Sequence, residues 1–73
     1  MKIKITVNGE EREVEENTTI TDLLVLENVK MPDMVSVEYN GEMLDREKFD
    51  TTQLKENDEV EFLYFMGGGN VGI

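Results

Sequence analysis

The chemically distinctive residues of this chain are three consecutive glycines, Gly67, Gly68 and Gly69, which follow an apolar segment that ends at Met66. Glycine has the greatest backbone freedom, so we expect this run to be mobile. The residues after Met66 would span about 23–25 Å if fully extended. A strand without side chains passes through channels that a Cβ atom would block. A frayed chain end without function is the alternative, and the glycines alone do not decide between the two.

The chain lacks the side chains on which most enzymes depend. Its 73 residues include no Cys and no His, which excludes disulfides, thiolate metal sites, the usual general base and the usual catalytic triad. Carboxylates are abundant, but in so acidic a composition a pair of them carries little information, and no nucleophile or base accompanies them. We therefore expect no enzyme, no metal site and no bound cofactor.

The charge of the chain is strongly negative, because 17 Asp and Glu oppose 7 Lys and Arg for a net charge of −10. Such a surface repels phosphate backbones, which argues against nucleic-acid binding. It favours partners with basic faces, although acidity also simply keeps a small protein soluble. No signal peptide and no segment of membrane-spanning length is recognisable. We expect one soluble cytoplasmic domain that is monomeric when free.

The N-terminal residues predict a β-hairpin. Residues 1–7 alternate apolar and polar side chains, which is typical of a strand with one buried face. Asn8-Gly9 suits a type I′ turn, in which both central residues need positive φ. Residues 10–16 should return antiparallel, and their many charges indicate an edge strand.

A helix is predicted over residues 17–29. Thr18 or Thr19 is a suitable N-cap, and Asp22 completes an approximate capping box with Thr19. The helix should end before Pro32. Its expected apolar stripe is formed by Ile20, Leu23, Leu24 and, as a further candidate, Leu26.

The second half of the chain predicts three more strands. Residues 34–39 alternate, Asn40-Gly41 marks a second tight turn, and residues 42–44 form a short returning strand. Residues 45–58 are irregular and polar, and residues 59–66 are the last and most apolar strand. Within the irregular segment the expected core side chains are Phe49 and Leu54.

These elements, in this order, favour an α+β fold. A mixed sheet of four or five strands, with one helix packed on one face and the first and last strands together at the centre, satisfies all of the patterns. This is the ubiquitin-like β-grasp. We expect residues 1–66 to form this domain and residues 67–73 to form a flexible glycine-rich C-terminal tail.

The last strand should have one buried and one exposed face, because one helix covers only one side of the sheet. Alternation assigns Val60 and Phe62 to the core. On the other face we expect Glu59 and Glu61 to form cross-strand charge pairs with the lysines of the first strand, Lys2 and Lys4.

The exposed face of the last strand ends in two apolar side chains, Leu63 and Phe65. Exposed apolar clusters commonly mark interaction sites. The alternatives are that the segment around Phe49 covers them, or that they are ordinary surface side chains. The predicted partner-binding residues are therefore Leu63, Phe65, Glu59 and Glu61.

A family resemblance rests on three stretches of sequence: VNGEEREVEE, TTITDLL and VSVEYNGEMLDREKFDTTQLKENDEVEFLYFMGGG. With them the chain up to Gly69 resembles the ThiS family, the sulfur carriers of thiamine biosynthesis, and is more distantly similar to MoaD and ubiquitin. The third stretch is more specific than the glycines alone, because it joins the predicted strands of the second half to the glycine run.

The resemblance implies that the chain is a carrier and a substrate, without catalytic activity of its own. A ThiF-type enzyme would use ATP to adenylate the carboxylate of a C-terminal glycine, Gly69. Sulfur from cysteine, supplied through a cysteine desulfurase, would then replace one oxygen. The thiocarboxylate would donate this sulfur to thiazole formation on a ThiG-type synthase. The absence of Cys and His agrees with this, because the reactive group must then be one that every chain has.

One feature departs from the family pattern, which ends on glycine. Here Asn70, Val71, Gly72 and Ile73 follow. We expect a protease to trim the chain after Gly69, with Gly68 as the alternative end point. The other account is that the protein is not a conventional carrier, or that the extra residues were added to it.

Other destinations and other classes of protein stay open at this point. Within the carrier interpretation, molybdopterin, cysteine or another sulfur-containing metabolite is an alternative to thiazole. Outside it, the chain is a ubiquitin-like modifier that forms an isopeptide bond with lysine, or a non-catalytic β-grasp binding module.

Overall fold

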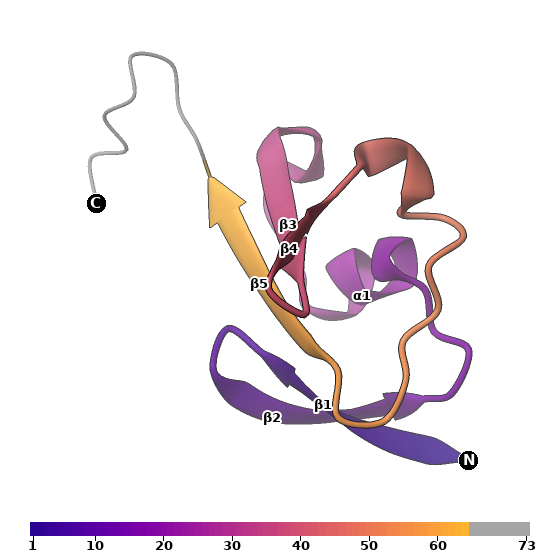
Figure 1. The fold of residues 1–73 in the computed structure, drawn as a ribbon. Helices are drawn as coiled ribbons and strands as arrows, with labels where there is room; N and C mark the ends of the chain where they lie inside the picture. Colours follow the sequence, from indigo (N-terminus) through magenta and orange to yellow (C-terminus); the bar gives the residue numbers. More distant parts are fainter. Residues whose placement is uncertain (65–73) are drawn as a thin grey trace.

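The computed structural model describes residues 1–64, which form one mixed sheet with a single α-helix against it (Figure 1). The elements in chain order are β1 (Lys2–Val7), β2 (Glu10–Glu15), α1 (Ile20–Leu26), the 3₁₀ turn η1 (Pro32–Met34), β3 (Val35–Tyr39), β4 (Glu42–Leu44), the 3₁₀ turn η2 (Arg46–Lys48) and β5 (Glu59–Tyr64). The predicted boundary at residue 66, the glycines Gly67, Gly68 and Gly69, and Phe65 lie outside the described residues.

The five strands are ordered β2-β1-β5-β3-β4 in the sheet. β1 and β5 run parallel at the centre, and the other neighbours are antiparallel. The predicted β-grasp fold, with the first and last strands side by side and β2 at an edge, is confirmed. No helix within residues 1–64 is long and apolar enough to cross a membrane.

Two Asn-Gly turns close the two hairpins. The φ angles are 51° at Asn8 and 83° at Gly9 in the first turn, and 52° at Asn40 and 87° at Gly41 in the second. Positive φ at both central residues is the type I′ geometry, which matches the right-handed twist of the flanking strands. Both turns were predicted from the sequence and are confirmed.

Helix α1 begins at a capping box. The Thr19 hydroxyl accepts a hydrogen bond from the Asp22 amide at 3.1 Å, and the Asp22 carboxylate accepts one from the Thr19 amide at 3.2 Å. Two of the otherwise unpaired donors at the helix start are thereby satisfied. Leu26 is 63% exposed, so its assignment to the apolar stripe is wrong. It follows Ile20 by six residues, which at about 100° per residue carries it off the buried face.

The core lies between α1 and the inner face of the sheet, the face that α1 covers. Its buried side chains are Ile5, Val7, Val14, Ile20, Leu23, Leu24, Val35, Val37, Phe49, Leu54 and Val60. Phe49 and Leu54 are therefore core residues, as predicted. Phe62 is only half-buried against this cluster, because the pairing of β1 with β5 ends at Val60 and leaves Phe62 with a neighbouring strand on one side only.

Candidate partner-binding face

The outer face of the sheet, the face away from α1, carries three of the four predicted contact residues. Strand register and side-chain alternation place the following residues on it: Lys2, Lys4, Thr6, Glu11, Glu13, Glu15, Ser36, Glu38, Met43, Glu59, Glu61 and Leu63. Strand β5 lies at the centre of this face and leads directly towards the glycine run. Its outer side chains are therefore those closest along the chain to the predicted reactive end.

The predicted pairing of Glu59 and Glu61 with Lys2 and Lys4 is wrong. In the parallel register the start of β5 lies against the end of β1, with Glu59 opposite Thr6. Lys4 lies instead beside the loop before β5, where its carbonyl accepts a hydrogen bond of 2.7 Å from the Asn57 amide. The cross-strand partners of Lys2 and Lys4 are Glu15 and Glu13 on β2.

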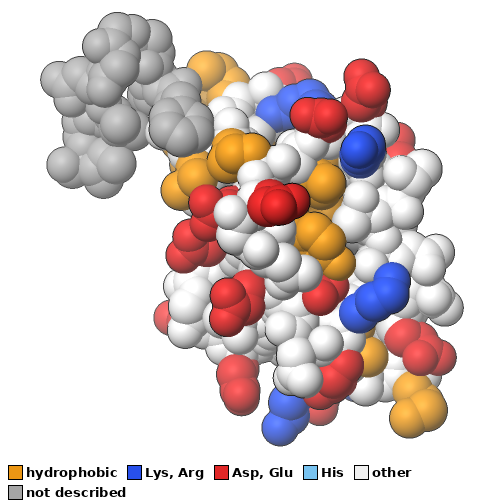
Figure 2. Space-filling view, viewed as in Figure 1, with side chains coloured by type: hydrophobic (Ala, Val, Ile, Leu, Met, Phe, Trp, Pro, Cys, Tyr) orange, Lys and Arg blue, Asp and Glu red, His pale blue; other side chains and the backbone are white. Residues whose placement is uncertain are grey.

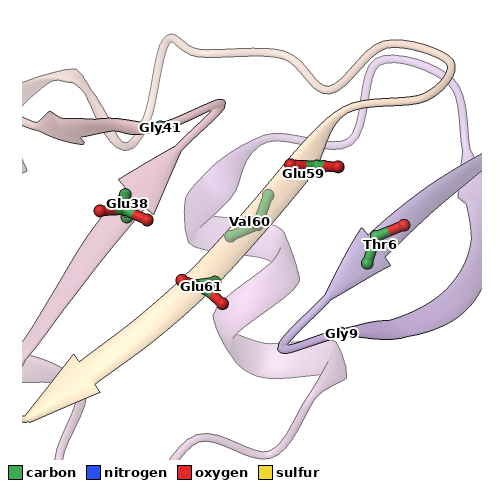
Figure 3. Close-up of a pocket in the computed structure, with 7 residues that line it drawn as sticks. All are labelled: Thr6, Gly9, Glu38, Gly41, Glu59, Val60 and Glu61. Atoms are coloured by element: carbon green, nitrogen blue, oxygen red, sulfur yellow. The ribbon is translucent and has the colours of Figure 1, made fainter.

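Three glutamates surround a shallow groove at the centre of the outer face. Glu59 and Glu61 come from β5, and Glu38 comes from β3, where it is the cross-strand partner of Glu61. Figure 3 shows these side chains together, with α1 behind the sheet. The groove has a volume of about 300 Å³, and its remaining lining residues are Thr6, Gly9, Gly41 and Val60. Glu38 was not predicted as a site residue, because only the register of β3 against β5 brings it to Glu61.

The asparagines of the two turns fasten the walls of this groove to β5. The Asn8 amide donates to the Val60 carbonyl, and the Asn8 side chain accepts from the Phe62 amide, both at 2.9 Å. On the other side the Asn40 amide donates to the Glu59 carbonyl, and the Asn40 side chain accepts from the Glu59 amide, both at 2.8 Å. These four hydrogen bonds therefore fix the shape of the groove before any partner binds.

A buried carboxylate, Asp58, anchors the loop just before β5. It accepts hydrogen bonds from the Tyr39 hydroxyl, from the Asn40 side chain at 3.2 Å and from the Lys55 amide at 2.7 Å. Burial, together with the hydrogen bond to Asp58, raises the pKa of Tyr39 to about 12. The sequence did not predict this role, since nothing local indicates that Tyr39 and Asn40 will converge on Asp58.

The charges around the groove are not neutralised within the described chain. The ion pairs found in residues 1–64 join the N-terminus to Glu15 and Glu16, and Arg12 to Glu10 and Glu27. None of them includes Glu38, Glu59 or Glu61. Like charges directly opposite each other in a sheet are destabilising. In the same part of the chain, no group of three or more His, Cys, Asp or Glu side chains is arranged to hold a metal ion.

At the end of β5 the outer face becomes apolar. Leu63 lies opposite Ser36 and is half-buried, more exposed than Val60 as predicted. Phe62 and Leu63 are both half-buried, so exposure does not separate these two. The segment around Phe49 does not cover Leu63, because the Phe49 carbonyl accepts a hydrogen bond from Thr21 of α1, on the opposite side of the sheet. Figure 2 shows hydrophobic side chains gathered in the upper left of the described surface, with acidic side chains spread over the rest of this view.

Solved structures of similar proteins share this fold. The crystal structure of the thiamine biosynthesis protein ThiS from Geobacter metallireducens is 49% identical with a TM-score of 0.84, and the match covers 92% of this chain and 100% of that chain. The solution structure of a thiamine biosynthesis protein from the same organism is 46% identical with a TM-score of 0.72, covering 97% and 94%. Ubiquitin from Caldiarchaeum subterraneum, 24% identical with a TM-score of 0.52 over 94% and 98%, shares the fold.

Sequence comparison gives the family. A thiazole synthase from Magnetococcus marinus is 36% identical over 67 residues, which are 92% of this chain, but the chain spans only 20% of the length of that relative. The profile of the ThiS family matches residues 5–69. That match includes nearly all of the described sheet and the glycine run. The chain therefore belongs to the ThiS family.

Proposed function

We propose that this protein is a sulfur carrier of thiamine biosynthesis, which carries sulfur as a thiocarboxylate on Gly69. The observation that carries the proposal is that the ThiS family match runs through the glycines and ends at Gly69. Similarity to two thiamine biosynthesis proteins and to a segment of a thiazole synthase supports this pathway. Neither a thiol nor an imidazole is present to carry or activate sulfur, which leaves the terminal carboxylate as the reactive group.

The chemistry requires activation, because a carboxylate is a poor acyl donor. On a ThiF-type enzyme, a carboxylate oxygen of Gly69 attacks the α-phosphorus of ATP and pyrophosphate leaves. The outer sulfur of a persulfide, formed from cysteine by a desulfurase, then attacks the carbonyl carbon, and AMP leaves with the electrons of the C–O bond. The acyl disulfide formed in this step is cleaved by a thiol reductant, which is itself oxidised to a disulfide and releases the thiocarboxylate. A ThiG-type synthase takes the sulfur from the resulting thiocarboxylate. Glycine suits this position because it has no side chain to crowd the carbonyl.

The four residues after Gly69 are incompatible with this chemistry while they are attached. A carboxylate on Ile73 carries a β-branched side chain next to the reacting carbon. We propose that a protease removes Asn70, Val71, Gly72 and Ile73, with Gly68 as the second possible end point.

The acidic groove is the proposed recognition surface for the activating enzyme. Glu38, Glu59 and Glu61 attract a basic face and speed the encounter, and the turn hydrogen bonds keep them in place. Leu63, with Phe65 beyond the described residues, adds apolar contact a few residues before the glycine run.

The test compares two forms of the protein, residues 1–69 and residues 1–73. Each is incubated with ATP, a ThiF-type enzyme, cysteine, a desulfurase and a thiol reductant, and intact mass and pyrophosphate release are measured. We expect the 1–69 form to release pyrophosphate and to gain the mass of one oxygen-to-sulfur exchange, and the uncleaved 1–73 form to do neither. A 1–69 form that releases no pyrophosphate would contradict the carrier function. Covalent conjugates on other proteins would instead indicate a protein modifier.

A further inference from the structure

A second surface near the end of β5 lies on the α1 side and is apolar. Val25 is 76% exposed, Met31 is 52% exposed and Met34 is 47% exposed. Val25 and Pro32 line a shallow groove of about 160 Å³, together with Leu24, Asn28 and Val29. Met31 precedes Pro32 in the chain, and Met34 follows it after one exposed acidic residue, Asp33. We name Val25, Met31, Pro32 and Met34 the α1–η1 shelf.

The backbone conformation at Met31 is unfavourable for a methionine, so local structure does not explain this side chain. Met31 has a φ of 53°, in the left-handed region. Within residues 1–64 every other non-glycine residue with positive φ is an asparagine, the side chain that tolerates this conformation best. A methionine at this position costs stability locally and exposes a large apolar side chain to water. A role in contact with another molecule accounts for both.

Hydrogen bonds hold the shelf to the end of β5. The Tyr64 hydroxyl donates to the Lys30 carbonyl at 2.8 Å, and Tyr64 pairs with Val35, the residue after η1. The Arg46 guanidinium donates to the Pro32 carbonyl at 2.9 Å and to the Val35 carbonyl. Figure 1 shows η1 next to the end of β5. These hydrogen bonds therefore fix the backbone of residues 30–35 relative to Tyr64, the last described residue of β5.

The length of chain beyond Tyr64 limits what can cover the shelf. Gly69 follows Tyr64 by five residues, which span at most about 18 Å when fully extended. An enzyme that takes Gly69 into its active site must therefore bring its own surface within this distance of Tyr64. The shelf is attached to Tyr64 through Lys30 and lies at the same end of the sheet.

We infer that the α1–η1 shelf is a docking surface for an apolar patch of the enzyme that adenylates Gly69. This inference rests on the proposed function. The groove lined by Val25 and Pro32 lies on the α1 side of the sheet, the acidic groove lies on the outer face, and the two surfaces act differently. The acidic groove attracts the enzyme through charge, and the shelf holds it by burying apolar side chains, as exposed apolar patches beside a functional element commonly do.

The experiment uses the 1–69 form and its activating enzyme. Val25→Glu places a charge on the shelf, and Leu26→Glu is the matched control, because Leu26 is also exposed but points about 100° away around the same helix. Both positions are exposed, so both variants should fold, which circular dichroism checks. We expect Val25→Glu to raise the KM for pyrophosphate release by about tenfold or more with little change in kcat. Leu26→Glu should behave like the unmodified sequence.

The possible outcomes separate the inference from the proposed function. If Val25→Glu has unchanged kinetics while the wild-type protein is active, docking at the shelf is contradicted and the proposed carrier function is not affected. A wild-type form that is never adenylated would contradict both. If the wild-type protein dimerises in gel filtration and Val25→Glu disperses the dimer, the shelf is a contact between copies of this chain and the inference is wrong. Should Val25→Glu fail to fold, Met34→Gln on η1 tests the same surface and must raise the KM.

Discussion

The two halves of the outer sheet face arrange charge in opposite ways. Between β1 and β2, Lys2 faces Glu15 and Lys4 faces Glu13, so opposite charges are direct cross-strand neighbours. Between β3 and β5, Glu38 faces Glu61, and Glu59 has Thr6 beside it. Each opposite-charge pair contributes about 0.2–1 kcal/mol to the stability of a sheet, and a like-charge pair is destabilising.

This difference separates charges that favour pairing of the strands from charges that oppose it. In the β1–β2 half, Lys2 and Lys4 each have a glutamate as cross-strand neighbour, which favours the sheet, although none of the ion pairs found in residues 1–64 joins them. In the β3–β5 half the register places two carboxylates against each other at the centre of the outer face, which does not favour it. The proposed recognition of a basic partner, next to the strand that leads to Gly69, would account for the charges of the β3–β5 half.

The largest expected effect concerns the carboxylate that holds the β3–β5 half together. Asp58→Ala leaves the Tyr39 hydroxyl, the Asn40 side chain and the Lys55 amide without their acceptor. We expect the free energy of unfolding in urea to fall by about 3 kcal/mol. Glu13→Ala, on the exposed β1–β2 half, should lower it by less than about 1 kcal/mol. Equal losses for the two variants would show that Asp58 does not have this anchoring role.

A charge reversal in each half tests whether the two halves contribute differently to partner binding. Glu61→Arg should weaken association of the 1–69 form with its activating enzyme by about tenfold, mainly through slower association, and should reduce the dependence of the association rate on salt. Glu13→Arg makes the same change of charge in the β1–β2 half. Surface plasmon resonance at two salt concentrations should show a clearly smaller effect for Glu13→Arg, and equal effects would mean that net charge alone determines association.

Neutralising the same two residues should change stability in opposite directions. Glu61→Gln removes the repulsion from Glu38 and should raise the free energy of unfolding by about 0.5 kcal/mol. Glu13→Gln removes an attraction to Lys4 and should lower it by a similar amount. Urea denaturation at low salt measures both, and a loss of stability in Glu61→Gln would contradict the argument from like charges.

The last expected effect is confined to alkaline pH, where stability should depend on the ionisation of Tyr39. The pKa of Tyr39 is raised to about 12 in the folded protein, against about 10 for an unperturbed tyrosine. Between pH 10 and 12 the folded state therefore binds more protons than the unfolded state, so the contribution of Tyr39 is complete below pH 10 and is lost as the pH rises towards 12. Tyr39→Phe should show a shallower loss of stability over this range, and identical pH profiles would contradict the prediction.

The parts of the fold that depend on neighbouring residues were predictable from the sequence. Both Asn-Gly turns, the capping box of Thr19 and Asp22, and the alternation that buries Val60 act over a few residues. The resemblance to the ThiS family, read from the same sequence, is confirmed by the family match. Gly69 as the reactive residue stays a prediction.

The composition of the groove was only partly predictable, because it depends on the register between strands far apart in the chain. Glu59 and Glu61 were placed on the correct face by alternation, but their neighbours were wrong. The sequence does not determine the offset of β5 along β1 in their parallel pairing. In the structure this offset is set by the loop before β5, which is anchored through Asp58. Glu38 joins the groove only through the antiparallel register of β3 with β5.

The most direct test of the central claim is the intact mass of the protein isolated from its own host, with fragmentation to locate any modification. We predict a population that ends at Gly69 and carries one sulfur in place of oxygen in its C-terminal fragment. A population that always retains Asn70–Ile73 and never gains sulfur, while the pathway enzymes are present and active, would contradict the assignment of this chain as a sulfur carrier.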